Sequence, residues 1–171
     1  HDGSHSYVSD TGTGNLNLKG QNLNLLASNS NDYLRCVQGG AVELYHNNVK
    51  KIETTANGIT VTGTAIATTD TDTTNTGSIT LDFAAKQNFV LTLTGNVTLA
   101  NPSTEQVGQS GFIAFIQDGT GGRTVALGTD YETPAAAGIT LTATAGATDL
   151  VPYLVVASNR ILLGTPQLAF A

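Results

Sequence analysis

The chain contains no tryptophan, and only one of its 171 residues is a cysteine. A single cysteine, Cys36, excludes an intrachain disulfide and any cysteine-rich metal site. Its neighbours Leu34, Arg35 and Val37 predict a strand that carries a buried, unreactive thiol. The absence of tryptophan disfavours a cellular carbohydrate-binding domain, and it also disfavours a glycosidase that stacks sugars on aromatic side chains.

Charged residues are also scarce, at 12 % of the chain, which is about half the usual share. The net charge is −6, and the seven basic residues are scattered, with Lys50–Lys51 as the only adjacent pair. Because phosphate binding requires clustered Lys and Arg, we expect no nucleic-acid partner. The chain has no run of 18 apolar residues, so the sequence predicts no membrane span.

The two halves of the chain differ in composition. All four prolines lie beyond residue 100 and all five phenylalanines beyond residue 80. Between the halves lies the polar stretch ATTDTDTTNTGS, residues 67–78, which is rich in turn-forming residues. The sequence therefore predicts one domain over residues 1–66, a linker over 67–76 and a second domain over 77–171.

The second half reads as short β-rich runs separated by turn signals. The runs include SITLDF, SGFIAFIQ and LVPYLVVA, and the turn signals lie at 94–96, 101–103, 118–122 and 158–159. This spacing is typical of a β-sandwich or barrel. Apart from a short turn around 134–137, no stretch shows helical periodicity. We predict a jelly-roll-like β-sandwich with its own aromatic core.

The first half has too few large residues for a core of its own. Ordering about 65 residues costs on the order of 1–2 kcal/mol each, whereas burying one leucine returns roughly 1.5–3 kcal/mol. Its apolar residues alternate with polar ones, which predicts strands with one apolar face, joined by turns at Asn47–Asn48 and Asn57–Gly58. Several identical chains can bury such faces together. Candidates for this shared core are Leu16, Leu18, Leu23, Leu25, Val42, Leu44, Ile59 and Val61.

Residues 6–64 resemble a module of fibre proteins of tailed bacteriophages, especially marine ones. The resemblance rests on GAVELY (40–45), KKIETT (50–55) and GITVTG (58–63). From Thr80 onward, NFVLTLTGNVTLANPS, GQSGFIAFIQDGTGGRTVALG and ATAGATDLVPYLVV resemble a C-terminal domain of phage virion proteins. The resemblance implies an all-β homotrimer: an intertwined shaft, like a β-prism or triple β-helix, followed by the sandwich head.

Several motifs that suggest chemistry have a plainer explanation. GTGGRT, 119–124, lacks the Gly-Lys-Ser/Thr ending of a phosphate loop, so we expect a hairpin loop with Arg123 paired to an acid such as Asp118. Asp70, Asp72 and Asn75 offer oxygens to a calcium ion, but their spacing lacks the glycine and glutamate of an EF-hand and favours a solvated linker. Asn96 opens a glycosylation sequon, which we interpret as an exposed turn.

No candidate catalytic, metal or cofactor site emerges from the residue pattern. The acids form no paired cluster, no Ser/His/Asp arrangement stands out, and His1, His5 and His46 lack metal-ligand spacing. A metal on the trimer axis, or contact between His1 and His5 of different chains, is an alternative that the sequence leaves open. We therefore expect a binding or structural protein rather than an enzyme.

The sequence and the resemblance together suggest a fragment of an extracellular virion fibre, a tail fibre that binds a glycan or protein on the host surface. Missing N-terminal residues would join it to other virion proteins. Expected contacts lie on loops 117–123 and 129–133: Gln117, Asp118, Arg123, Tyr131 as the aromatic contact, and Glu132. The competing hypothesis is a capsid-attached fibre or decoration protein whose head serves trimerisation and assembly.

Overall fold

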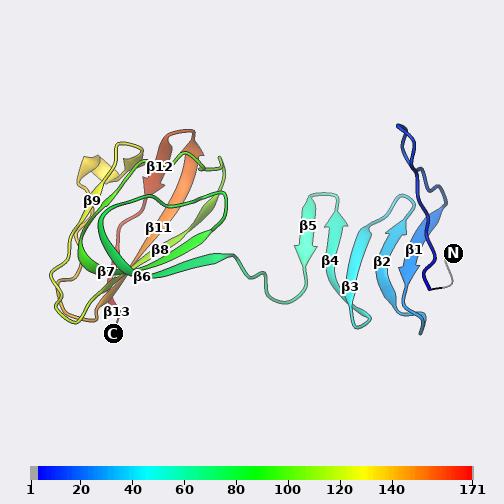
Figure 1. The fold of residues 1–171 in the computed structure, drawn as a ribbon, viewed down its shortest axis with the longest axis horizontal. Helices are drawn as coiled ribbons and strands as arrows, with labels where there is room; N and C mark the ends of the chain where they lie inside the picture. The colour runs from blue at the N-terminus through cyan, green and yellow to red at the C-terminus, as the bar shows by residue number, and fades with distance from the viewer. Residues whose placement is uncertain (1–3, 171) are drawn as a thin grey trace. The chain divides into compact units, whose positions relative to one another are not determined.

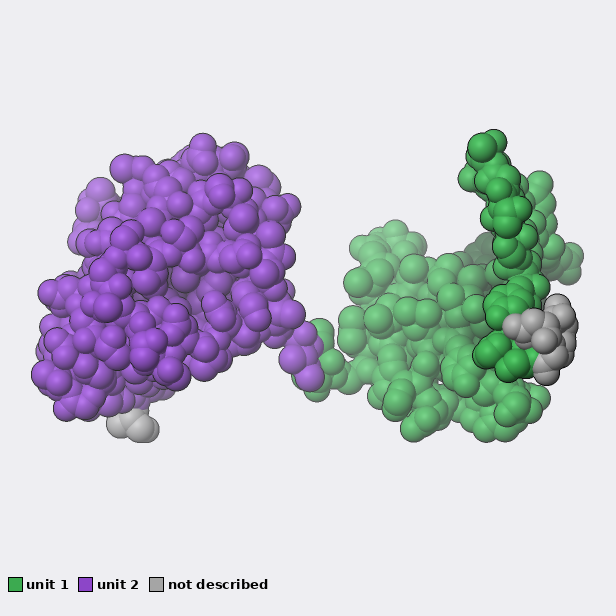
Figure 2. Space-filling model, viewed as in Figure 1, with its two compact units in different colours: residues 1–65 green, residues 66–171 purple. Residues whose placement is uncertain are grey.

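The computed structural model describes residues 4–170 and divides the chain into two compact units, residues 1–65 and 66–171 (Figures 1 and 2). Each unit is built from β-strands, with a single short 3₁₀ turn, η1 (Pro134–Ala136), among the described residues. The expectation of an all-β chain is confirmed. No helix within residues 4–170 has the length and hydropathy that crossing a membrane requires.

Unit 1 is a five-stranded antiparallel sheet in which each strand pairs with the next along the chain (Figure 1). Its strands are β1 (Asn22–Leu26), β2 (Asp32–Val37), β3 (Val42–His46), β4 (Val49–Thr55) and β5 (Gly58–Val61). The predicted turns at Asn47–Asn48 and Asn57–Gly58 join the last three strands. Both asparagines of the first turn have positive φ, 49° and 60°, as a tight hairpin turn requires.

The leucine alternation at Leu16 and Leu18 predicted a strand that the structure does not contain. Strand structure begins at Asn22, and the described residues before it form no ladder with any other described segment. A period-two pattern becomes a strand only where a neighbouring strand accepts its backbone hydrogen bonds. Residues 4–21 are assigned to no strand.

Unit 2 is an eight-stranded curled sheet (Figure 1). Six strands follow the order β10-β12-β11-β8-β7-β6, with β13 paired to β11 and β9 paired to β7. The strands are β6 (Thr69–Ile79), β7 (Asn88–Leu99), β8 (Ser110–Gln117), β9 (Val125–Leu127), β10 (Tyr131–Glu132), β11 (Thr148–Ala157), β12 (Arg160–Leu163) and β13 (Gln167–Phe170). Strand β7 runs parallel to β6, β8 and β9. A jelly roll is antiparallel, so that part of the expectation is not confirmed.

Most of the predicted linker belongs to a strand. Residues 69–79 form β6, which pairs with β7 from Thr69 opposite Asn88 to Ile79 opposite Leu99. Threonine favours strands, and β6 lies at the edge of the sheet, where polar side chains remain solvated. Polarity therefore suggested a linker where the structure has an edge strand.

The turn predicted at residues 94–96 is also absent, because β7 continues through it. The strand pairs with β8 over residues 89–93 and with β9 over 97–99. A Cβ at Gly95 would lie 2.2 Å from the Thr76 Oγ1 of β6. The glycine thus permits close approach of two strands, a role that glycine has within sheets as well as in turns.

The buried hydrophobic core of the described residues lies entirely in unit 2. Its aromatic centre is Phe83, whose ring centroid lies 5.1 Å from that of Phe89 and 5.2 Å from that of Tyr153. The connection between β6 and β7 supplies Phe83 together with Leu81, and both are almost fully buried. None of the described residues of unit 1 is buried.

Candidate functional site

The strand register of unit 1 places most of its large aliphatic side chains on one face of the sheet. Residues directly opposite one another across antiparallel strands point to the same side. One row crosses the whole sheet with one residue from each strand: Leu25, Leu34, Leu44, Ile52 and Val61. A second row contains Leu23, Cys36 and Val42, and Ile59 lies opposite Thr54. We call these two rows, together with Ile59, the apolar ladder.

The apolar ladder is uncovered within one chain. Most of its side chains are exposed, from 36 % at Ile52 to 70 % at Ile59, whereas Leu34 and Cys36 are half-buried. Six of the eight predicted shared-core residues lie on it: Leu23, Leu25, Val42, Leu44, Ile59 and Val61. The other two, Leu16 and Leu18, are exposed outside any strand. The sequence candidates missed Leu34, Cys36 and Ile52, although the alternation of Leu34 with Cys36 carried the signal.

The opposite face of the same sheet carries a charged network. Tyr45 donates a hydrogen bond to the Glu43 carboxylate at 2.8 Å, and this bond lowers the pKa of Glu43. Lys50 pairs with both Glu43 and Glu53, and Arg35 lies 3.6 Å from Glu43. The two faces therefore differ sharply: one satisfies its polar groups within the chain, and the other leaves its apolar side chains in water.

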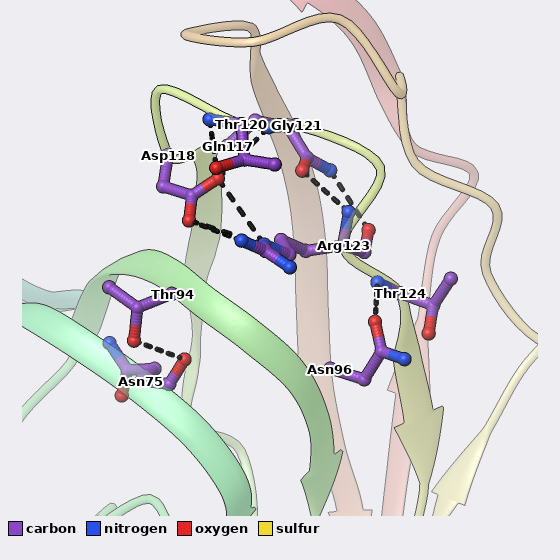
Figure 3. Close-up of polar contacts among 9 residues, drawn as sticks. All are labelled: Asn75, Thr94, Asn96, Gln117, Asp118, Thr120, Gly121, Arg123 and Thr124. Carbon is purple, nitrogen blue, oxygen red and sulfur yellow. Dashed lines mark hydrogen bonds and ion pairs between the residues drawn. The ribbon is translucent and has the colours of Figure 1, made fainter.

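In unit 2 the predicted loop between β8 and β9 is held by its own side chains (Figure 3). We call residues 117–124 the contact loop. The Asp118 carboxylate accepts hydrogen bonds from the backbone N–H groups of Thr120 (3.0 Å) and Gly121 (2.9 Å). It also pairs with the Arg123 guanidinium at 2.8 Å, as the sequence predicted. The Arg123 hydrogen bonds and the Gly121 N–H lower the pKa of Asp118 to about 2.

The side chains of Gln117 and Asn96 also hold the contact loop (Figure 3). The Gln117 side-chain amide brackets the backbone of Arg123, donating to its carbonyl at 2.9 Å and accepting from its N–H at 2.8 Å. Asn96 of β7 accepts a hydrogen bond from the N–H of Thr124 at 3.1 Å. The sequon asparagine thus braces a loop from within a strand, not from the expected turn. A loop held in this way loses little conformational entropy when it binds a partner.

Two of the five predicted receptor contacts are buried. Gln117 is 3 % exposed and Tyr131 is 5 % exposed, so neither side chain lies at a loop tip. Tyr131 belongs to β10, opposite Ile161, and alternation turns its ring into the core, where desolvation raises its pKa. The expected role of Tyr131 as the aromatic contact is therefore wrong.

The other three predicted contacts are partly exposed and engaged in ion pairs. Asp118 pairs with Arg123 in the contact loop. Glu132 makes a two-pronged pair with Arg160 of β12, at 2.7 and 2.8 Å, which lowers the pKa of Glu132. Arg160 was not predicted as the partner of Glu132, because 28 residues separate the two in the sequence.

We expect the contact loop to depend on Gly121 more than on Gly122. Both have positive φ, 74° and 71°, so alanine at either costs roughly 1–2 kcal/mol in backbone strain. A Cβ at Gly121 would also lie 2.4 Å from the Ala143 carbonyl oxygen, whereas one at Gly122 meets nothing within 4 Å. Gly121→Ala should therefore destabilise unit 2 by about 3 kcal/mol or more. Thermal unfolding of both variants tests this expectation, and equal losses would contradict it.

Residues 4–170 contain no group of three or more His, Cys, Asp or Glu side chains arranged to hold a metal ion. His1 lies outside the described residues. Asp70 and Asp72, the proposed calcium-ligand alternative, lie in the edge strand β6. Among the surfaces that remain for interaction are the apolar ladder and the contact loop.

Comparison with known proteins gives one family match. Residues 73–156 match the family model described as "Putative phage tail fibre C-terminal domain". This segment runs from β6 to near the end of β11 and includes the contact loop. No curated protein and no solved structure matches the chain. The match supports the phage tail fibre family and a virion-associated protein.

Proposed function

We propose that this chain is the distal part of a tail fibre that assembles as a homotrimer and attaches the phage to its host cell by multivalent, non-covalent binding. The observation that carries the proposal is the combination, in one chain, of a tail fibre domain match over residues 73–156 and an uncovered apolar ladder in the adjoining unit. The number of chains rests on the resemblance of residues 6–64 to phage fibre modules, which also suggests that residues 1–66 form an intertwined shaft.

The apolar ladder supports assembly on energetic grounds. Each large aliphatic side chain moved from water into an interface contributes roughly 1.5–3 kcal/mol when fully buried. The ladder offers eight such side chains per chain, namely Leu23, Leu25, Leu34, Val42, Leu44, Ile52, Ile59 and Val61. A single-layer sheet cannot cover this face itself, so copies of the same sheet are its natural cover.

Attachment would work through several weak sites held together. Copies of the contact loop on one assembly gain avidity through their high effective concentration, without a strong individual contact. Bacterial cell surfaces are usually anionic, so the net charge of −6 per chain provides no long-range electrostatic attraction to the host cell. Recognition of a host glycan or protein would then depend on short-range hydrogen bonds, and the chain would act as a binding protein rather than an enzyme.

The test measures binding of the full chain to host cells. We expect Thr120→Arg, a bulky change at an exposed tip of the contact loop, to reduce cell binding at least tenfold without altering the oligomeric state. Ser103→Arg, at an exposed residue outside the loop, is the matched control and should bind normally. Binding of the unchanged chain should vary little from about 0.1 to 0.5 M salt, although the Debye length falls from roughly 10 Å to roughly 4 Å. Absence of any cell binding would rule out attachment.

One observation favours the alternative role as a capsid-attached fibre or decoration protein. The polar side chains of the contact loop are largely engaged with one another: Gln117 with the Arg123 backbone, and Asp118 with the Arg123 side chain. Such a loop leaves few groups free for a receptor. A trimer that fails to bind cells, but is located on the capsid by antibody labelling of intact particles, would support this alternative.

A further inference from the structure

Unit 2 has an uncovered apolar face of its own. In β8 and β11 the residues that alternate with the core side chains Ile113, Phe115, Val151 and Tyr153 point to the other side of the sheet. Several of these outward residues are large and apolar. Phe112 is 46 % exposed, Leu154 43 % and Leu162 38 %. We call the set the outer face: Phe112, Ala114, Leu150, Pro152, Leu154 and Leu162.

The register makes the outer face continuous across three neighbouring strands. Phe112 of β8 lies opposite Pro152 of β11, and Ala114 lies opposite Leu150. Leu154 lies opposite Ser110 on one side and Leu162 of β12 on the other. The patch is therefore a block of adjacent side chains, not a scatter of single exposed residues.

The outer face carries no charge of its own. Two charged residues lie at its border: Glu132 of β10, which is opposite Leu162, and Arg160 of β12. Glu132 and Arg160 form an ion pair with each other. A charged partner would find no complementary group on the patch. The outer face is complementary to another uncharged apolar surface.

The area of the outer face indicates which kind of partner could bind it. Strands lie about 4.8 Å apart and rise about 3.3 Å per residue, so the block measures on the order of 300 Å². A stable complex of independent proteins buries about 800 Å² on each partner. The outer face alone would not hold an unrelated protein, but a small patch suffices between domains that are already tethered together.

We infer that the outer face packs against the head of a second copy of this chain, once the apolar ladders of unit 1 have brought the copies together. This inference rests on the proposed homotrimer and extends it, because it assigns a self-contact to the tail fibre domain as well as to the shaft. The outer faces of the heads turn toward one another around the common axis of the assembly.

The test uses the full chain with its one native thiol replaced, Cys36→Val, and a new thiol placed at Leu162→Cys on the outer face. The control is Ala126→Cys, at an exposed residue of β9 outside that face. In the assembled protein we expect a maleimide to label Leu162→Cys at least tenfold more slowly than Ala126→Cys. Adding Leu25→Asp, which breaks the ladder, should make the two rates equal.

Light scattering measures the oligomeric state of each variant, so the outcomes of the labelling experiment can be distinguished. An intact assembly in which both thiols react at the same rate overturns the self-contact of the heads and leaves the proposed function standing. A chain that is monomeric without Leu25→Asp overturns the proposed trimer and the head contact together. Phe112→Cys provides a second outer-face thiol, and it must give the same protection if Leu162→Cys folds poorly.

Discussion

Leu25→Asp is expected to dissociate the assembly, whereas Asn24→Asp, one residue away on the same strand, should leave it intact. Leu25 lies in the apolar ladder opposite Leu34, and Asn24 lies opposite Arg35 on the charged face. A carboxylate buried without a partner costs several kcal/mol, and a trimer would bury three. Since 1.4 kcal/mol is a factor of ten in affinity, association should weaken by far more than 100-fold.

The paired variants separate assembly from ordinary instability. Leu25 is 53 % exposed in the single chain, so the same substitution in an isolated monomer should change stability by no more than about 0.5 kcal/mol. The measurement is the molar mass of both variants by light scattering across a dilution series. A Leu25→Asp chain that keeps the mass of the unchanged assembly would show that the ladder does not hold the copies together.

Phe89→Ala should produce the largest loss of stability in unit 2. Phe89 is 1 % exposed and its ring packs beside Phe83 and near Tyr153. Removing a buried phenylalanine side chain costs about 3–5 kcal/mol, because transfer energy is lost and a cavity remains. In a unit of this size the unfolding temperature should fall by roughly 15–30 °C. Calorimetry measures this change, because the unfolding transition of unit 2 should not depend on protein concentration.

The control is the same phenylalanine-to-alanine substitution at an exposed position. Phe170 of β13 is 50 % exposed, so Phe170→Ala should lower the unfolding temperature by only a few degrees. The transition of unit 1 should keep its dependence on concentration in both variants, because the core that Phe89 belongs to lies wholly in unit 2. A shift of both transitions by Phe89→Ala would mean that the two units unfold as one.

Local signals in the sequence predicted the strands and hairpin turns of unit 1, although the intertwined shaft remains a prediction. Asn47–Asn48 and Asn57–Gly58 each specify a tight turn, and successive hairpins then follow without information from distant residues. The exception is the segment around Leu16 and Leu18, whose alternation is equally clear but which pairs with none of the strands described in residues 4–170. Pattern alone therefore identifies residues suited to a strand, and pairing decides which of them become one.

Unit 2 was harder to predict, because its pairings join distant segments. The edge position of β6 made polar threonines compatible with a strand, and nothing local to residues 69–79 indicates that position. At the candidate site, the pairing of Asp118 with Arg123 was predictable, since both lie in one loop. The burial of Tyr131 depends on Ile161 of β12, 30 residues later, whereas the turn-forming residues next to Tyr131 indicated an exposed loop.

The contrast between local and distant pairing also governs the order in which the chain acquires its structure. Hairpins such as those of unit 1 form in about 1–10 μs, whereas sheets dominated by contacts far apart in sequence fold in milliseconds to seconds. Parallel β7 must wait for β6, β8 and β9 to be brought alongside it. In an assembling fibre the apolar ladders would thus meet while the heads are still incomplete. Maturation would then be limited by a first-order step within each head, with a rate that more protein does not accelerate.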